Sequence, residues 1–255
     1  MATDNNTILN EIPIISVCGK GGVGKTVISA LLSRTLIETK NKPVLLVDAD
    51  PVGGLTSAVG VKVVDTLAGV RNKFIEEARK GVKSDLEQAA DQLDYFILNA
   101  LVERDGFSLL AMGHTNDKGC FCPANKLLRS AIEVLISSFK GVLIDAEAGI
   151  EQINRDVTVR VNRVIVVIDA SQRSMDTLLM IEKMVGAEKI AVIANRVPAD
   201  IKLTLPGKAE LYGIVPEDEE LKKFDREGVP LWELPADNAA LMAVKEIAVK
   251  LGLVS

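Results

Sequence analysis

Short apolar runs alternate along the chain with longer segments whose apolar residues repeat at helical spacing. The short runs are rich in Val, Ile or Leu and apolar on both faces, which is typical of buried parallel strands. They are Ile12–Cys18, Val44–Asp48, Tyr95–Asn99, Val142–Asp145, Val164–Asp169 and Ile190–Ala194. The segments with helical spacing are Lys25–Thr39, Ala124–Phe139, Ser174–Val185 and Asn238–Leu251. Strands that alternate with helices in this way predict right-handed crossovers and an α/β fold built on a doubly wound, mostly parallel sheet.

The sequence gives no sign of division into separate domains. We find no internal repeat, low-complexity tract or linker rich in Pro, Gly and Ser, so we expect residues 1–255 to form a single domain. Its most charged and least strand-like stretch is Gly60–Gln92, which we interpret as a helical excursion on that domain.

Composition and charge argue against several classes of binding partner. The 255 residues carry a formal net charge of -5 and only 4% aromatic residues, whereas nucleic-acid binders usually have a basic face with stacking aromatics. No apolar run approaches the roughly 18 residues of a membrane span, and the polar start of the chain differs from a signal peptide. Three cysteines are too few for a disulfide scaffold. We therefore expect a cytoplasmic protein that binds neither nucleic acid nor membrane.

Residues 19–26 read GKGGVGKT and match the phosphate-binding pattern G-x-x-x-x-G-K-[ST]. They stand between a predicted strand and a predicted helix, which is the context that this pattern requires. Glycines let backbone N–H groups surround phosphate oxygens, and the helix that follows directs its positive end at the same anion. We expect the amine of Lys25 to reach the β- and γ-phosphate oxygens and the hydroxyl of Thr26 to bind Mg²⁺. The predicted nucleotide contacts of this loop are Gly19, Lys20, Gly21, Gly22, Val23, Gly24, Lys25 and Thr26.

The additional lysine at the second position, Lys20, makes this loop similar to the deviant Walker A motif of MinD, ParA, the nitrogenase iron protein and related P-loop NTPases. The resemblance implies that the protein hydrolyses ATP with Mg²⁺, acts as a homodimer, and uses Lys20 to reach the nucleotide of the partner subunit. It extends from Ile12 to about Leu251, because further motifs of the family follow in order.

Two acidic motifs resemble the switch segments of that family. Residues 47–51 read VDADP, and residues 143–151 read LIDAEAGIE. Carboxylates that follow parallel strands lie at the edge of the sheet where ligands of open α/β folds bind. The resemblance implies that Asp50 polarises the attacking water, that Asp145 holds Mg²⁺ through water, and that Gly149 senses the γ-phosphate. We expect Asp48 only to cap the end of its strand.

Two later segments resemble the base-recognition segments of the family. Residues 191–197 read AVIANRV, and residues 212–218 read YGIVPED, which contains a Gly-x-x-Pro turn that ends at Pro216. The resemblance implies that Asn195 offers its amide to the adenine edge, since an amide can pair with N6 and N7 together.

Cys120 and Cys122 form a C-x-C pair in the segment GCFCP. Cysteines two residues apart cannot easily close a relaxed disulfide. Pro123 favours the first turn of the helix that follows, which places Cys122 near a helix N-terminus, where the metal-binding thiolate is favoured. Two sulfurs are half of a tetrahedral site, and a two-fold dimer would supply the other half. The pair therefore predicts a Cys₄ site on a dimer axis.

With this pair, with Met112-Gly113 before it, and with the D-x-x-A-G-I-E pattern from Asp145, the sequence resembles a narrower branch of the family. This branch is the CooC-type nickel-insertion ATPases of carbon monoxide dehydrogenase maturation. The resemblance implies that the cysteines bind Ni²⁺ or Zn²⁺ between two subunits, and that the partner is a nickel enzyme such as carbon monoxide dehydrogenase.

Two other functions remain open at this point. The same ATPase could carry an iron–sulfur cluster on its cysteines, or it could be a positioning ATPase of the MinD/ParA kind.

The remaining candidate ligands carry less weight. We interpret His114 as an ordinary loop histidine, because a Cys₄ site needs no further ligand, and Cys18 as a small core residue.

Overall fold

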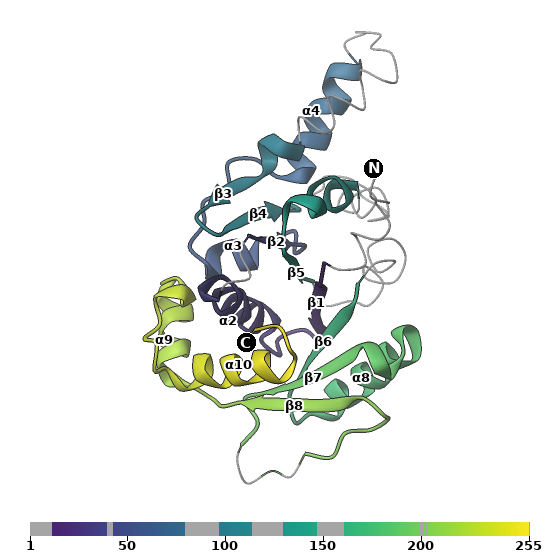
Figure 1. Ribbon diagram of the computed structural model, residues 1–255, viewed down its shortest axis with the longest axis vertical. Coiled ribbons are helices and arrows are strands. Elements are labelled where there is room, and N and C mark those ends of the chain that lie inside the picture. Colours follow the sequence, from purple (N-terminus) through teal and green to yellow (C-terminus); the bar gives the residue numbers. More distant parts are fainter. Residues whose placement is uncertain are drawn as a thin grey trace, which may run out of the picture.

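The computed structural model describes residues 12–39, 43–79, 97–113, 130–146, 161–198, 201 and 203–254. Its centre is an eight-stranded sheet with the order β3-β4-β2-β5-β1-β6-β7-β8 (Figure 1). Every neighbouring pair is parallel except β3 and β4, which form an antiparallel hairpin at one edge. The strands are β1 (Ile14–Gly19), β2 (Val44–Asp48), β3 (Val102–Arg104), β4 (Phe107–Ala111), β5 (Gly141–Asp145), β6 (Arg163–Ile168), β7 (Ile190–Asn195) and β8 (Glu210–Val215). The predicted doubly wound, mostly parallel sheet is thus confirmed.

Helices cover both faces of this sheet. Helices α2, α3 and α10 contribute to the apolar cluster on one face, and α4 and α8 contribute to the cluster on the other (Figure 1). The helices are α2 (Lys25–Glu38), α3 (Gly54–Ala58), α4 (Leu67–Arg79), α8 (Gln172–Val185), α9 (Glu219–Glu227) and α10 (Ala239–Lys250), and the short 3-10 turns are η1 (Ile136–Ser138), η4 (Ala187–Lys189) and η5 (Leu231–Glu233).

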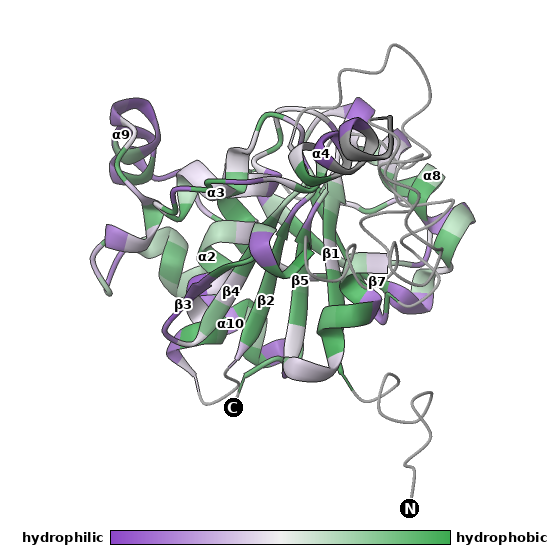
Figure 2. Ribbon diagram, turned by 90° about the horizontal axis from the view of Figure 1, so that it is seen from above, coloured by the Kyte–Doolittle hydropathy of each residue, from purple (hydrophilic) through white to green (hydrophobic). Residues whose placement is uncertain are grey.

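The two-faced core follows from the apolar runs of the sequence. Side chains of a strand alternate between the faces of a sheet, so a run that is apolar throughout can only be buried if both faces are covered. In β1, Ile14 and Cys18 lie in one apolar cluster, whereas Ile15 and Val17 lie in the other. Figure 2 shows the hydrophobic strands between their helices and the more hydrophilic α9 at the periphery.

The prediction of a strand at Tyr95–Asn99 is wrong. Its described part belongs to a helical turn at residues 97–100, in which Ile97 is buried and Leu98 is 55% exposed. A short apolar run fits a buried strand and a half-buried helix equally well, so its periodicity could not decide between them. The strands β3 and β8 were not anticipated, because they carry exposed and polar positions, and β4 was also missed although all five of its residues are buried.

The charged stretch Gly60–Gln92 includes α4, as the expected helical excursion requires. The described part of the expected helix at Ala124–Phe139 is residues 130–139; residues 130–138 are helical and end in η1, and Phe139 is extended. In the part of the chain that the structure describes, we find no helix that is both long and apolar enough to cross a membrane.

The C-terminal part of the chain is fastened to α2. The indole N–H of Trp232 donates to the carbonyl of Ala30 at 2.9 Å and reaches the hydroxyl of Ser33 at 3.2 Å. The same indole meets the ring of Phe107 edge-on, with 4.8 Å between ring centroids. Arg34 also donates to the carbonyl of Leu234 at 2.6 Å. The helix that begins at the phosphate loop is therefore held along its length by residues about 200 positions away.

Gly213→Ala should destabilise the protein by about 1–3 kcal/mol, because a core this dense tolerates added atoms poorly. A Cβ at this position would lie 2.5 Å from Cγ1 of Ile247 on α10. Urea unfolding measures the change. In an Ile247→Ala background the added methyl has room, so the cost of Gly213→Ala should largely disappear; an equal cost in both backgrounds would contradict the packing described here.

Candidate functional site

The parallel strands bring the candidate residues to one edge of the sheet. Asp48 of β2 and Asp145 of β5 are directly paired in register, and β5 and β6 flank β1. Because parallel strands all end at the same edge, the segments after them meet there. These segments hold the loop 19–26 after β1, Asp50 after β2, Asp145 at the end of β5, Asn195 at the end of β7 and Pro216 after β8.

Two glycines of the loop, Gly19 and Gly24, have positions where any side chain would clash. Gly19 has φ 144°, and a Cβ there would lie 2.3 Å from the carbonyl oxygen of Val167 on β6. Gly24 has φ 90°, and a Cβ there would lie 2.4 Å from Nδ2 of Asn195. Gly24 directly precedes α2, so the loop leads into the N-terminus of a 14-residue helix. This is the geometry in which backbone N–H groups and a helix end bind an anion.

Asn195 holds the loop from the side. Its side chain is buried, and its Nδ2 donates to the carbonyl oxygen of Val23 at 2.8 Å. In this conformation the amide nitrogen therefore supports the loop, a contact that the sequence did not suggest. Pro216 is exposed on the neighbouring strand end, where the N–H of Arg196 donates to the carbonyl of Val215. Base recognition by Asn195 and Pro216 stays a prediction.

Asp48 and Asp145 form a buried acidic pair. Burial raises the pKa of Asp48 to about 7, although the N–H of Thr56 donates to its carboxylate at 2.9 Å. Burial also raises the pKa of Asp145 to about 6, against the effect of the Ser29 hydroxyl, which donates at 2.8 Å. The proximity of Asp145 raises the pKa of Asp48 further. Two carboxyl groups beside one another in a dry sheet edge leave a strong demand for positive charge.

The donor set here fits Mg²⁺. The hydroxyl of Thr26 hydrogen-bonds to Asp145, so the group expected to bind the ion and the carboxylate expected to hold it through water are adjacent. Mg²⁺ prefers oxygen ligands and is usually held by one or two protein groups together with phosphate and water. Among the residues that the structure describes, no three His, Cys, Asp or Glu side chains converge on one point. The arrangement is that of a site completed by a nucleotide.

The segment after β2 is tied to this pair. The N–H of Asp50 donates to Asp48 at 3.2 Å, and the carboxylate of Asp50 accepts the N–H of Val52 at 2.8 Å. A Cβ on Gly54, at the start of α3, would lie 3.3 Å from Cγ2 of Thr26. Asp48 is thus more than a strand cap: through two backbone N–H groups it positions the segment that carries Asp50.

The two lysines of the loop point to different partners. The amine of Lys25 donates to the carbonyl of Lys20 at 3.4 Å, so it lies across its own loop. The amine of Lys20 lies 2.9 Å from a carboxylate oxygen of Asp169 and 3.1 Å from the hydroxyl of Ser171. Hydrogen bonds from Ser171, Ser174 and Lys20 outweigh the opposite effect of burial and hold the pKa of Asp169 below its usual range. Asp169 was not predicted as a site residue. Its only feature in the sequence is that its carboxylate directly follows a buried strand.

Several predicted residues lie outside the described residues: Gly149, His114, Cys120 and Cys122. Cys18 is described, and it is buried under the phosphate loop. Burial raises the pKa of its thiol to about 12, so it is neither a metal-binding thiolate nor a nucleophile at neutral pH. Its interpretation as a core residue is confirmed.

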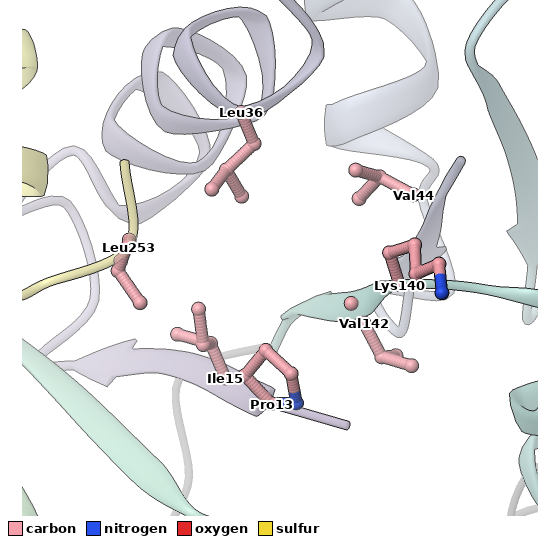
Figure 3. A pocket seen from close by; sticks show the side chains of 8 residues that line it. Pro13, Ile15, Leu36, Val44, Lys140, Val142 and Leu253 are labelled. Atoms are coloured by element: carbon pink, nitrogen blue, oxygen red, sulfur yellow. The ribbon is translucent and has the colours of Figure 1, made fainter. Parts of the chain in front are cut away.

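A small apolar cavity lies at the opposite edge of the sheet, where β1, β2 and β5 begin (Figure 3). Its volume of about 30 Å³ is close to that of one water molecule, so no nucleotide fits there. Its lining includes Pro13, Ile15, Leu36, Val44, Val142 and Leu253.

Comparisons with known proteins agree with this geometry. Residues 14–231 match the family described as the CobQ/CobB/MinD/ParA nucleotide binding domain. An uncharacterised ATP-binding protein of Methanocaldococcus jannaschii is 37% identical over 252 residues, covering 93% of this chain and 98% of that protein. The carbon monoxide dehydrogenase accessory protein CooC of Rhodospirillum rubrum is 34% identical over 254 residues, covering 90% and 94%. The structure of the septum site-determining protein MinD of Pyrococcus horikoshii, complexed with Mg-ADP, has a TM-score of 0.66 at 21% identity, covering 94% and 96%, and shares the fold.

The free energy of unfolding of the nucleotide-free protein should fall as the pH rises from about 4 to about 7. The folded chain binds the protons of Asp48 and Asp145 more tightly than the unfolded chain, so the stability they give is present at low pH and lost through their raised pKa values of about 7 and about 6. One such carboxyl contributes up to about 1.4 kcal/mol per pH unit. Urea unfolding between pH 5 and pH 7 measures the slope.

Asp48→Asn should flatten this pH dependence, because it removes the titrating group with the higher pKa. His114→Gln serves as the control, since a histidine ordinarily titrates near pH 6.5, within the same window. A slope that survives Asp48→Asn and disappears in His114→Gln would assign the effect to the histidine and contradict the prediction.

Proposed function

Since this chain belongs to the CobQ/CobB/MinD/ParA nucleotide-binding family, we propose that it is a dimeric, Mg²⁺-dependent ATPase that handles a nickel or zinc ion for a client metalloenzyme. The observation that carries the ATPase part is the convergence at one sheet edge. The glycine loop, the buried acidic pair and Asp50 stand together there, and α2 begins at the loop.

Each group has a part in phosphoryl transfer. Backbone N–H groups of the loop and the amine of Lys25 hold the phosphates, and the hydroxyl of Thr26 and Asp145 hold the metal. When bound, Mg²⁺ would supply positive charge that stabilises the negative charge developing on the phosphate oxygens. Its positive charge would also oppose the effect of burial, which raises the pKa of Asp48 and Asp145.

Asp50 orients the attacking water. Its side chain is only half-buried, and the hydrogen bond from its N–H to Asp48 fixes its backbone. A carboxylate in this place accepts a hydrogen bond from water and directs the oxygen lone pair toward the γ-phosphorus. Lys20 of each subunit reaches the phosphates of the partner subunit and completes the charge compensation.

The cargo metal binds to Cys120 and Cys122. Two thiolates from each subunit form a four-sulfur site on the two-fold axis, which suits Zn²⁺ when it is tetrahedral and Ni²⁺ when it is square-planar. Hydrolysis at the phosphate loop loosens the dimer and so changes the shared site. The carbon monoxide dehydrogenase accessory protein of R. rubrum, at 34% identity, supports a nickel enzyme such as carbon monoxide dehydrogenase as the client.

Asp50→Asn should keep ATP binding but lower turnover by about 100-fold or more. The asparagine can still accept the N–H of Val52, so the local backbone is kept while the charge that orients water is lost. Nucleotide titration and phosphate release measure the two effects. Lys25→Ala is the matched variant that should lose tight binding itself. Unchanged turnover in Asp50→Asn would remove this residue from the mechanism.

The dimer should hold one divalent ion, which is about half an ion per chain. Cys120→Ala and Cys122→Ala should each lose most of the metal affinity, whereas Cys18→Ala should keep it, because Cys18 is buried in the core. Thiolate ligands must be deprotonated, so the affinity should weaken as the pH falls. Equilibrium dialysis with metal analysis decides this; one ion per monomer, or full binding by the Cys120 and Cys122 variants, would reject a shared site.

Two alternatives give different measurements on the same protein. An iron–sulfur carrier would show iron and visible absorbance after anaerobic purification. The fold shared with MinD is also compatible with a positioning ATPase. Such a protein would co-sediment with lipid vesicles or DNA in the presence of ATP.

A further inference from the structure

Lys20 is held by its own chain in the structure. Gly19 and Val167 are paired in register, so the residues after β1 and β6 leave the sheet side by side. The amine of Lys20 forms an ion pair with Asp169 at 2.9 Å and donates to Ser171 at 3.1 Å. Lys20 and Asp169 keep only 28% and 32% of their side-chain surface exposed.

The acceptor is preformed, because the start of α8 fixes it independently of the lysine. The other oxygen of the Asp169 carboxylate accepts the hydroxyl of Ser174 at 2.6 Å, the N–H of Ser171 at 3.0 Å and the Ser171 hydroxyl. Ser171 is also the N-cap of α8 and accepts the N–H of Ser174. The carboxylate therefore offers Lys20 a fixed, charged acceptor, the arrangement in which a hydrogen bond is strongest.

We propose that this ion pair is a latch, which we call the Asp169 latch, and that it must open before Lys20 can contact a second subunit. The proposal rests on the function proposed above, in which Lys20 crosses to the partner's nucleotide. A lysine has one ammonium group, and in the monomer its hydrogen bonds go to Asp169 and Ser171. The phosphates of the partner subunit therefore compete with Asp169, and the latch favours the monomer until nucleotide is bound in the facing subunit.

The two-fold symmetry of a dimer increases the effect of the latch on the dissociation constant. A partly exposed ion pair typically shifts an equilibrium by about two- to fivefold. Both subunits must release their lysine, so the apparent dissociation constant of the dimer rises by the square of that factor, about four- to twenty-five-fold. A modest contact thereby becomes a sizeable barrier to pairing without nucleotide.

Asp169→Asn is the variant that opens the latch with the least disturbance. Its side-chain oxygen can still accept the hydrogen bonds of Ser171 and Ser174, but its amide presents no charge to Lys20. Ser174→Ala is the matched control, because it removes the two hydrogen bonds between the Ser174 hydroxyl and Asp169 and leaves the ion pair. A role of Asp169 limited to the start of α8 would make the two variants alike.

Sedimentation with a non-hydrolysable ATP analogue and Mg²⁺ measures the dimer. Asp169→Asn should lower the apparent dissociation constant by about four- to twenty-five-fold, while Ser174→Ala stays within about twofold of the parent. An unchanged or weaker dimer in Asp169→Asn, or an equal change in Ser174→Ala, would overturn the latch.

A second measurement tests the latch without any dimer. Limited acetylation of the nucleotide-free monomer should modify Lys20 about two- to fivefold faster in Asp169→Asn, relative to the exposed Lys62 as an internal reference. An unchanged ratio overturns the proposal. A parent chain that never dimerises with ATP would reject the proposed function, and the acetylation ratio would still decide whether Asp169 restrains Lys20.

Discussion

Parallel pairing of β1 with β5 on one side and β6 on the other fixes where the functional groups of this protein stand. The pairing places the end of β1, and with it the phosphate loop, between Asp145 and Asp169. The same register sets Asp48 beside Asp145. A shift of one residue in any of these strands would turn a carboxylate from the site toward the opposite face, because strand side chains alternate. The chemistry of the edge is thus a consequence of the register.

That register buries two carboxyl groups side by side, and the energetic cost of their negative charge can be offset when a nucleotide binds with its metal. Asp48 and Asp145 are almost wholly buried, and their raised pKa values express how poorly the dry sheet edge accommodates two negative charges. The positive charge of Lys25 lowers the pKa of Asp145 but does not outweigh burial, and Lys20 is paired with Asp169. A nucleotide with its metal brings the cation that the pair demands, so ligand binding and stability are linked at this edge.

The sequence predicted those parts of the site that are encoded locally. The phosphate loop is a contiguous pattern with its strand before it and its helix after it, and the central strands are contiguous apolar runs. The contact between Lys20 and Asp169 joins residues 149 positions apart, and no local pattern encodes which strand end meets which. Likewise, the hydrogen bond from Asn195 to the loop depends on β7 lying near the loop, which only the strand order reveals. The wrong strand prediction at Tyr95–Asn99 has a different cause. A short apolar run forms a strand if both of its faces are buried and a helix if only one is, and the sequence alone does not show which faces are buried.

The attachment of Trp232 to α2 also gives the protein a built-in optical probe. It is the only tryptophan of the chain, and its indole N–H is bonded to the backbone of the helix that starts at the phosphate loop. Indole emission responds to the polarity and hydrogen bonding around the ring, so a change in the seating of α2 alters the spectrum at a position remote from the ligand. Any movement of α2 on nucleotide binding can therefore be followed in solution by intrinsic fluorescence, without a label.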